Sequence, residues 1–223
     1  MTTLLLLRHG RTTANASGVL AGDLPVELDD YGRAQAEAVG VRLAPLPLAA
    51  VVSSPLLRCR QTVELALPGR PVQIEPRLTE CGYGDWIGRP LKELAGEPLW
   101  RTVQQHPAAA TFPGGESMAS MATRAVAAIR AWDTRLAAEH GDAAIWVASS
   151  HGDVIKAIVA DALALHLDLF QRINVEPGSI TAIRYTEHRP FLLRLSDSGG
   201  DLTPLVPRKQ EVPAGDAPVG GGS

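Results

Sequence analysis

Short runs of apolar residues alternate along this chain with longer segments in which apolar residues recur every three or four positions. Runs of the first kind, such as residues 2–7, are typical of buried strands, and the longer segments indicate amphipathic helices. Asp29 or Asp30 caps one such helix, and Pro55 is expected to open another at its first position. The pattern predicts strands at 2–7, 48–54, 71–75, 143–150, 179–185 and 190–196, and helices at 29–46, 55–67, 115–140 and 152–165.

The alternation of strands and helices predicts an α/β protein in which helices cover both faces of a mostly parallel central sheet. We therefore expect a three-layer α/β/α sandwich. The strands predicted at 179–185 and 190–196 are separated only by a short turn, which indicates a hairpin and one antiparallel region at the sheet edge. A small cap, at about residues 81–115, interrupts the alternation.

Composition indicates that one folded domain accounts for most of the 223 residues. We assign residues 1–198 to that domain and expect residues 199–223, rich in glycine and proline, to be a disordered tail. The net charge of −3 provides no basic field for nucleic acid, and no apolar run has the length of a membrane span. Cys59 and Cys81 lack metal-ligand spacing and fit a reduced cytoplasmic protein.

Cationic and imidazole side chains follow several of the predicted strands. The first strand runs into Arg8 and His9, and the strand at 143–150 runs into His151. Arg58 lies on the helix that follows another strand. Because ligands bind beyond the carboxyl ends of parallel strands, we expect these side chains to converge there. The set suits a phosphoryl group, since guanidinium pairs with phosphate oxygens and neutral imidazole is a nucleophile toward phosphorus.

Such a reaction also needs a proton donor for the leaving oxygen, and Glu80, in the stretch RLTECGYGDW, is the candidate. It precedes an irregular glycine-containing segment that could bring it to the same edge of the sheet. Taken alone, each of these residues has an ordinary explanation, such as a solvated arginine or a surface carboxylate. Their combination favours a site for phosphate chemistry.

Five motifs carry a resemblance to a known family. They occur in order over residues 2 to about 196 and read LLLLRHGRTTAN, VVSSPLLRCRQT, LTECGYGDWIGRPLKEL, FPGGES and SSHGDVIKA. The chain resembles the histidine phosphatase superfamily, the phosphoglycerate-mutase-like proteins. Within it, the chain is similar to an actinobacterial group of proteins described as phosphomutases.

The resemblance implies a role for each matching residue. His9 would be the nucleophile that becomes phosphohistidine, and Glu80 would protonate the leaving oxygen and then accept a proton from water. The residues implied to bind the phosphoryl oxygens are Arg8, Arg58 and His151. Those implied to bind substrate are Thr12, Asn15, Gly22 and Gly152. No metal and no cofactor is implied, because the arginines would supply the positive charge.

Two activities stay open within this resemblance. The mutases carry a long insertion between the catalytic glutamate and the second histidine, with adjacent arginines for the substrate carboxylate. Here the stretch is short, and Arg101 stands alone. We therefore expect a phosphatase acting on small phosphorylated metabolites, as a monomer or a homodimer, with a phosphomutase as the alternative. An inactive phospholigand-binding protein is a weaker alternative because every catalytic position is filled, and a metallohydrolase is weaker because no acidic cluster accompanies His9 and His151.

Several other residues bear on the substrate. Arg11 adds a cation that either pairs with a cap carboxylate or meets a second anionic group, whereas Asp153 would repel a second phosphate. The cap aromatics are expected to form the core of the cap rather than to stack on substrate; they are Tyr83, Trp86, Trp100 and Phe112. The cap cations that could contact the rest of the substrate are Arg89, Lys92, Arg101 and His106.

The two cysteines flank catalytic candidates, since Cys59 follows Arg58 and Cys81 follows Glu80. Modification of either thiol could therefore disturb the site. Buried, inert thiols are the simpler interpretation, because free cysteine is among the most buried residue types.

Overall fold

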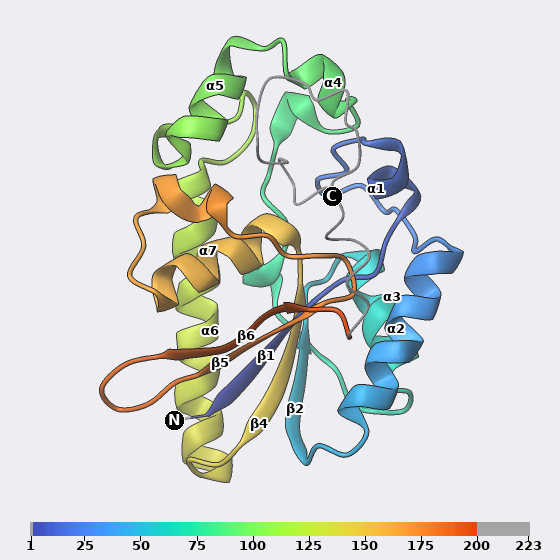
Figure 1. Cartoon of the computed structure of the whole chain (residues 1–223), viewed down its shortest axis with the longest axis vertical. Helices are drawn as coiled ribbons and strands as arrows, with labels where there is room; N and C mark the ends of the chain where they lie inside the picture. The colour runs from blue at the N-terminus through green and yellow to red at the C-terminus, as the bar shows by residue number, and fades with distance from the viewer. Residues whose placement is uncertain (1, 200–223) are drawn as a thin grey trace.

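The computed structural model describes residues 2–199 and is built around a six-stranded sheet in the order β3-β2-β4-β1-β5-β6 (Figure 1). The strand bounds are β1 Thr3–Arg8, β2 Leu48–Ser53, β3 Gln73–Ile74, β4 Ile145–Ser150, β5 Ile180–Arg184 and β6 Phe191–Asp197. Strands β1 to β4 are parallel, whereas β5 is antiparallel to β1 and to β6. The predicted α/β fold with its antiparallel edge is therefore confirmed. Residues 200–223 of the predicted tail lie outside the described residues.

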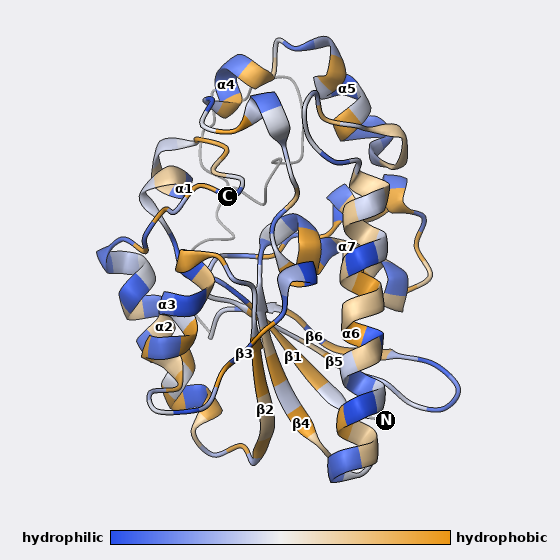
Figure 2. Ribbon diagram, turned by 180° about the vertical axis from the view of Figure 1, so that it is seen from behind, coloured by the Kyte–Doolittle hydropathy of each residue, from blue (hydrophilic) through white to orange (hydrophobic). Residues whose placement is uncertain are grey.

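Helices form a layer on each face of the sheet (Figures 1 and 2). One layer contains α2 (Asp30–Leu43) and α3 (Leu57–Ala66), and the other contains α6 (Met118–His140) and α7 (Gly152–Ala162). Alternate residues of β1 enter two separate cores: Leu4 and Leu6 belong to the core that includes α6 and α7. Leu5 and Leu7 belong to the core that includes α2 and α3. This burial on both faces explains why the first strand is an unbroken apolar run.

Two helices begin later than the sequence pattern predicts. Pro55 lies outside α3, because Leu56 is the N-cap with an extended backbone and its N–H donates to the hydroxyl of Ser54 at 3.3 Å. The prediction that Pro55 opens this helix is wrong. Helix α6 begins at Met118 rather than at residue 115, since Ser117 is its N-cap and accepts a hydrogen bond from the backbone N–H of Ser120 at 3.0 Å.

A cap of short helices stands over the carboxyl ends of the parallel strands, at the top of Figure 1. It comprises η2 (Gly84–Trp86), α4 (Leu91–Leu94), α5 (Pro98–Gln105) and η3 (Pro107–Ala109). The four cap aromatics are buried, as predicted. The ring centroid of Phe112 lies 5.0 Å from that of Tyr83 and 5.2 Å from that of Trp86, so these rings form the core of the cap.

The remaining elements are α1 (Thr13–Ser17), η1 (Pro76–Leu78) and η4 (Leu167–Arg172). Among the helices of residues 2–199, none combines the length and the apolar character that crossing a membrane requires. Helix α1 and the segment after η1 lie beneath the cap, and both contribute to the site described next.

Candidate active site

The two candidate histidines follow neighbouring parallel strands in register. Arg8, the last residue of β1, is paired with Ser150, the last residue of β4. The backbone N–H of His9 then donates to the carbonyl of Ser150 at 3.1 Å, which brings His9 beside His151. The centroids of the two imidazole rings lie 5.3 Å apart. The predicted convergence at the carboxyl edge of the sheet is therefore present for these side chains.

Two hydrogen bonds fix the tautomer of His9. Its Nδ1 lies 2.8 Å from the carbonyl oxygen of Gly10, which can only accept, so Nδ1 carries the proton. On the other side of the ring, the Nε–H of Arg58 donates to Nε2 at 3.2 Å. Burial, followed by the charges of Arg58 and Arg8, lowers the pKa of His9 well below its ordinary value. His9 is therefore a neutral imidazole whose lone pair is at Nε2.

Arg58 is almost fully buried and is oriented by the loop that follows α1. Its Nη2 donates to the carbonyl of Gly22 at 2.7 Å, and its Nη1 lies 3.4 Å from the carbonyl of Leu24. Gly22 has φ +55°, and a Cβ there would lie 2.7 Å from a side-chain carbon of Ile87. A glycine is therefore required where this loop contacts both Arg58 and the cap.

Arg8 is a fully buried cation beneath the pocket. Its Nη1 donates to the carbonyl of Val175, whereas Nε and Nη2 have no hydrogen-bond partner within residues 2–199. Burial lowers its pKa to about 10, so the side chain is still a cation at neutral pH. A buried charge with unpaired N–H groups is costly, and an anion is the ligand that would satisfy it.

His151 and the thiol of Cys59 are in contact behind His9. The Nε2 of His151 forms a hydrogen bond of 2.7 Å with the Ser54 hydroxyl and lies 3.5 Å from Cys59 Sγ. Burial, followed by the charge of Arg58, lowers the pKa of His151 well below its ordinary value. Burial raises the pKa of the Cys59 thiol to about 12, and it also raises the pKa of Cys81. Both thiols have no exposed surface, which favours the inert interpretation over modification.

Glu80 is nearly buried at the pocket wall, where its Oε1 accepts a hydrogen bond of 3.0 Å from the backbone N–H of Cys81. Burial, reinforced by the charge of Asp153, raises the pKa of its carboxyl group to about 7. Arg58 and Arg8 act in the opposite direction. The carboxyl group can therefore carry a proton near neutral pH, as a general acid must.

A half-buried arginine on α6, missed in the sequence, holds the segment that carries Glu80. Arg124 donates to the backbone carbonyls of Thr79 at 2.8 Å and Glu80 at 2.9 Å. It also forms an ion pair with Glu116, whose Oε1 accepts a hydrogen bond of 2.8 Å from the backbone N–H of Gly82. The motif FPGGES contains Glu116 and was the only sequence signal for this support.

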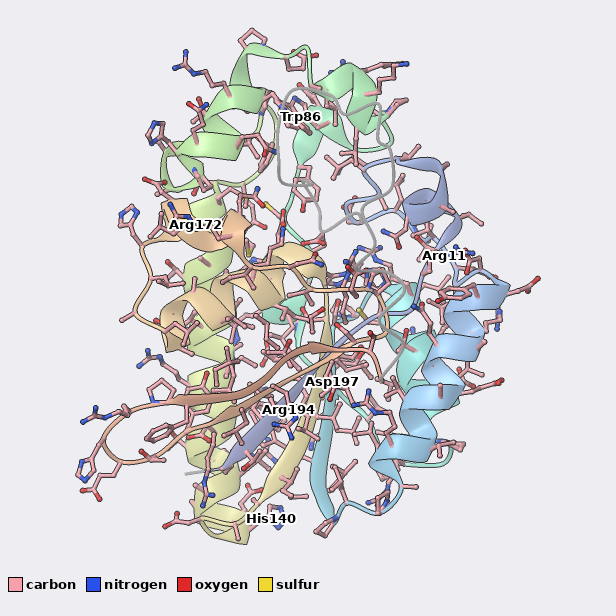
Figure 3. All side chains as sticks on the ribbon, viewed as in Figure 1. Arg11, Trp86, His140, Arg172, Arg194 and Asp197 are labelled. Carbon is pink, nitrogen blue, oxygen red and sulfur yellow. The ribbon has the colours of Figure 1, made fainter. Side chains whose placement is uncertain are left out.

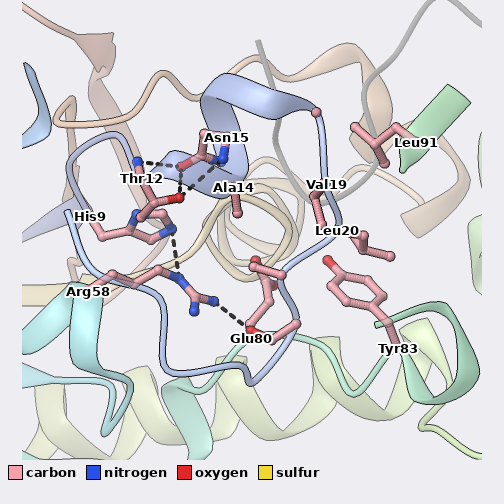
Figure 4. A pocket seen from close by; sticks show the side chains of 13 residues that line it. His9, Thr12, Ala14, Asn15, Val19, Leu20, Arg58, Glu80, Tyr83 and Leu91 are labelled. Atoms are coloured by element: carbon pink, nitrogen blue, oxygen red, sulfur yellow. Dashed lines mark hydrogen bonds between the residues drawn. The ribbon is translucent and has the colours of Figure 1, made fainter. Parts of the chain in front are cut away.

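The pocket at this edge is narrow, and water-sized molecules can occupy about 30 Å³ of it. Figure 4 shows the side chains that line it. Six of the nine predicted site residues are on its wall: His9, Thr12, Asn15, Gly22, Arg58 and Glu80. The other three, Arg8, His151 and Gly152, lie behind this wall and are buried.

Thr12 and Asn15 bond to each other as the cap of α1. The Oδ1 of Asn15 accepts from Thr12 N at 3.1 Å, and the hydroxyl of Thr12 accepts from Asn15 N at 3.2 Å. The side-chain amide nitrogen of Asn15 donates to no group within residues 2–199 and lines the pocket with His9. Its predicted contact with phosphate is therefore sterically open.

The profile of the histidine phosphatase superfamily (branch 1) matches residues 4–198 of this chain. The chain belongs to this superfamily. It is 36% identical over 172 residues to a glucosyl-3-phosphoglycerate phosphatase of Mycolicibacterium vanbaalenii, an alignment that covers 74% of this chain and 76% of that protein. It is 30% identical over 211 residues to a probable phosphoglycerate mutase of Erwinia tasmaniensis, covering 92% of this chain and 95% of that protein.

Solved structures of the histidine phosphatase superfamily share this fold. A mycobacterial glucosyl-3-phosphoglycerate phosphatase superposes with a TM-score of 0.75 at 28% identity, and the match covers 87% of this chain and 98% of that one. The superfamily thus includes both phosphatases and a mutase-like protein among the relatives of this chain.

Two residues singled out in the sequence for their bearing on the substrate have partners within the protein. Arg11 lies beside the start of α2 (Figure 3), where its Nε pairs at 2.7 Å with Asp29, the N-cap of that helix. The predicted pairing of Arg11 with a cap carboxylate is wrong. Asp153 is fully buried, lies outside the pocket wall and accepts a hydrogen bond of 2.8 Å from the hydroxyl of Tyr83.

Proposed function

We propose that this protein is a metal-independent phosphatase that hydrolyses small phosphate monoesters through a phosphohistidine intermediate on His9. One observation carries the proposal: His9, a neutral imidazole whose Nε2 accepts a hydrogen bond from Arg58, lines the same pocket as Glu80, which comes from another segment of the chain. A nucleophile and an acid on different sides of one pocket are what phosphoryl transfer through an enzyme intermediate requires.

In the first step, Nε2 of His9 attacks phosphorus, and the bond from phosphorus to the ester oxygen breaks. The proton on Glu80 passes to the leaving oxygen, so that the alcohol departs neutral. The phosphoryl oxygens take up the N–H groups of Arg8 that have no partner within the described chain, together with those of Arg58. The Nδ1–H bond to Gly10 stabilises the imidazolium charge that forms on His9.

In the second step, the ionised Glu80 takes a proton from a water molecule, whose oxygen attacks phosphorus. The bond from phosphorus to Nε2 breaks, and its electron pair returns to the imidazole. Inorganic phosphate leaves, and both residues regain their starting protonation states. His151, kept neutral by burial and by the cations around it, serves in both steps as a ligand for phosphoryl oxygen.

Phosphate release from a panel of phosphorylated metabolites, measured in EDTA for the wild type and His9→Ala, tests this proposal. We expect release that the chelator does not reduce and that the substitution abolishes. Release that requires a divalent metal, or that persists in His9→Ala, would overturn it.

A phosphomutase is the second candidate, because one relative is named a probable phosphoglycerate mutase. A mutase returns the phosphoryl group to the bound product instead of to water. It therefore depends on a bisphosphorylated primer and converts one phosphate isomer into another without net phosphate release. Both products are measured in the same panel.

For the setting of this activity, we propose a cytoplasmic enzyme whose partner is a small phosphorylated metabolite. Whether it acts as a monomer or a homodimer is decided by its mass in solution, measured by light scattering.

A further inference from the structure

The pocket has two chemically different sides, visible in Figure 4. His9 and Arg58 stand on one side, where they are joined by a hydrogen bond, and in this view Glu80 lies between them and the ring of Tyr83. On the opposite side lie the apolar side chains of Val19, Leu20 and Leu91, with the ring of Tyr83. The first side receives the phosphoryl group, so the second faces the part of the substrate that leaves.

Backbone hydrogen bonds between the loop after α1 and the cap fix the shape of the apolar side. Leu20 N donates to the carbonyl of Arg89 at 3.0 Å, and Gly88 N donates to the carbonyl of Leu20 at 2.8 Å. Leu91 N donates to the carbonyl of Gly18 at 2.8 Å. The ring of Tyr83 is held by its hydroxyl, which donates to Asp153, and by its edge contact with Phe112. This wall is therefore preformed.

The cap cations predicted to contact substrate are not on this wall. Arg89 forms an ion pair of 2.7 Å with Glu97, and Arg101 donates to Gln105 at 3.1 Å. Lys92 is exposed to solvent, and His106 lies 3.8 Å from Asp168. None of these four candidates lies on the pocket wall, and each points to another partner or to water. Among the wall residues within 2–199, Arg58 is the only arginine or lysine, and it faces the phosphoryl side.

A second anionic group on the substrate would therefore meet an unfavourable environment. It would lose its hydration against Val19, Leu20 and Leu91, with no cation of the described wall to pair with it. Glu80, once ionised, adds a negative charge close by. An uncharged group would instead bury apolar surface against the same side chains, which is favourable.

We propose that the substrates are phosphate monoesters whose leaving group is uncharged and largely apolar or aromatic, rather than phosphorylated acids or bisphosphates. This inference rests on the proposed phosphatase activity and narrows it. It also distinguishes the expected substrates of this chain from those of an enzyme that binds a substrate carboxylate.

A matched pair of aryl esters tests the inference: 4-carbamoylphenyl phosphate and 4-carboxyphenyl phosphate, which have nearly the same shape and differ in one charge. For the wild type in EDTA we expect kcat/KM to be at least about tenfold higher for the neutral carbamoyl ester. Equal or faster hydrolysis of the carboxylate ester would overturn the substrate class and leave the phosphatase activity standing. Hydrolysis of neither ester, nor of any member of the metabolite panel, would overturn the proposed function itself.

Substitutions on the apolar side of the pocket test whether its residues cause the preference for the neutral ester. Leu91→Ala should lower kcat/KM for the neutral ester by about threefold to tenfold, while the inhibition constant of inorganic phosphate stays unchanged. Leu193→Ala, a half-exposed leucine on β6 far from the pocket wall, is the matched control and should leave both values unchanged. Leu91→Lys should shift the preference toward the carboxylate ester. An unaltered preference in both Leu91 variants would contradict the assignment of this wall.

Discussion

The Nε atom of Arg58 lies 3.2 Å from the Nε2 atom of His9, so a guanidinium donor is bonded to the lone pair that attacks phosphorus in the proposed mechanism. Together with the bond from Nδ1 to Gly10, this contact keeps His9 in one tautomer and in one orientation. In that mechanism, the oxygens of the entering phosphoryl group replace Nε2 as acceptors for Arg58. The same residue thus orients the nucleophile and then neutralises the group that is attacked.

Replacing the guanidinium group of Arg58 by the single ammonium group of lysine should lower the activity strongly. We expect Arg58→Lys to lower kcat/KM by about a hundredfold to a thousandfold, because lysine cannot donate from the Nε position and cannot pair with phosphate in bidentate fashion. Steady-state kinetics with one neutral aryl ester measure this loss. Arg60→Lys, on the exposed side of the same helix, is the control and should behave as the wild type. A loss below about threefold in Arg58→Lys would argue against the role of the guanidinium group.

The pKa of about 7 for Glu80 predicts the pH dependence of the first step. The proton donor is present below this pKa, so the rate of phosphoryl transfer to His9 should fall as pH rises through about 7. Single-turnover kinetics from about pH 5.5 to about pH 9, a range that extends to both sides of this pKa, measure the limb. Glu80→Gln should abolish the limb together with most of the activity. A limb that survives in Glu80→Gln would assign the titration to another group.

The same raised pKa has a consequence for stability. The folded protein holds the Glu80 proton to higher pH than the unfolded chain does, so this group costs no stability at acid pH and destabilises the fold as pH rises through its folded pKa. We therefore expect Glu80→Gln to raise the melting temperature more at pH 8 than at pH 5, since the amide has no charge to bury. Differential scanning calorimetry at the two pH values measures the difference; an equal shift at both would contradict it.

Asp153 should set part of the Glu80 pKa, because its buried carboxylate is the second cause of the raised value, after burial itself. We expect Asp153→Asn to move the alkaline limb of the first step to lower pH. The groups that act on Asp153 include the hydroxyl of Tyr83 and the amine of Lys156, whose nitrogen lies 3.6 Å from its Oδ1, together with the charges of Arg8 and Glu80. In Asp153→Asn, the buried amine of Lys156 is left beside a neutral side chain. The double variant Asp153→Asn with Lys156→Met removes that amine as well, so its pH profile reports the loss of the carboxylate alone.

Asp161→Asn is the matched control for this prediction, because Asp161 lies on the same helix and pairs with Arg130 at the surface. Its alkaline limb should coincide with that of the wild type. If the limb of Asp153→Asn also coincides with the wild type, the carboxylate does not tune Glu80.

Arg8 should bind phosphate at the expense of stability. Replacing a buried, incompletely paired cation by an apolar side chain of similar length is often neutral or stabilising, so Arg8→Met should keep or raise the melting temperature. Inorganic phosphate should raise the melting temperature of the wild type and leave that of Arg8→Met unchanged. Thermal unfolding with and without phosphate measures both effects, and an equal phosphate shift in the two proteins would exclude Arg8 as a ligand.

The sequence predicts the centre of this molecule well, for identifiable physical reasons. The run Leu4 to Leu7 is apolar at every position and short, which favours a strand covered on both faces, as strands of a parallel sheet are. Parallel strands end at one edge, which brings Arg8, His9 and His151 together without further information.

The hydrogen bonds and ion pairs that hold the site residues in place could not be predicted in the same way. Arg124 donates a hydrogen bond to the backbone carbonyl of Glu80, and Tyr83 donates one to Asp153. Each bond joins residues that are distant in the chain and share no periodic pattern. The start of α3 was misplaced because proline at a helix start and proline two residues before it give the same local signal. The partner of Arg11 was misjudged because Asp29 was already explained as a helix cap.

The most direct test of the central claim is to locate the phosphoryl group on the enzyme. Wild-type protein mixed with a reactive neutral aryl phosphate in EDTA, quenched during the first turnover in alkali and mapped by mass spectrometry, should carry a single phosphohistidine at His9. His9→Ala should carry none and should release no alcohol in the first turnover. A phosphoryl group on His151 or another residue, or a full burst of alcohol from His9→Ala, would contradict the account.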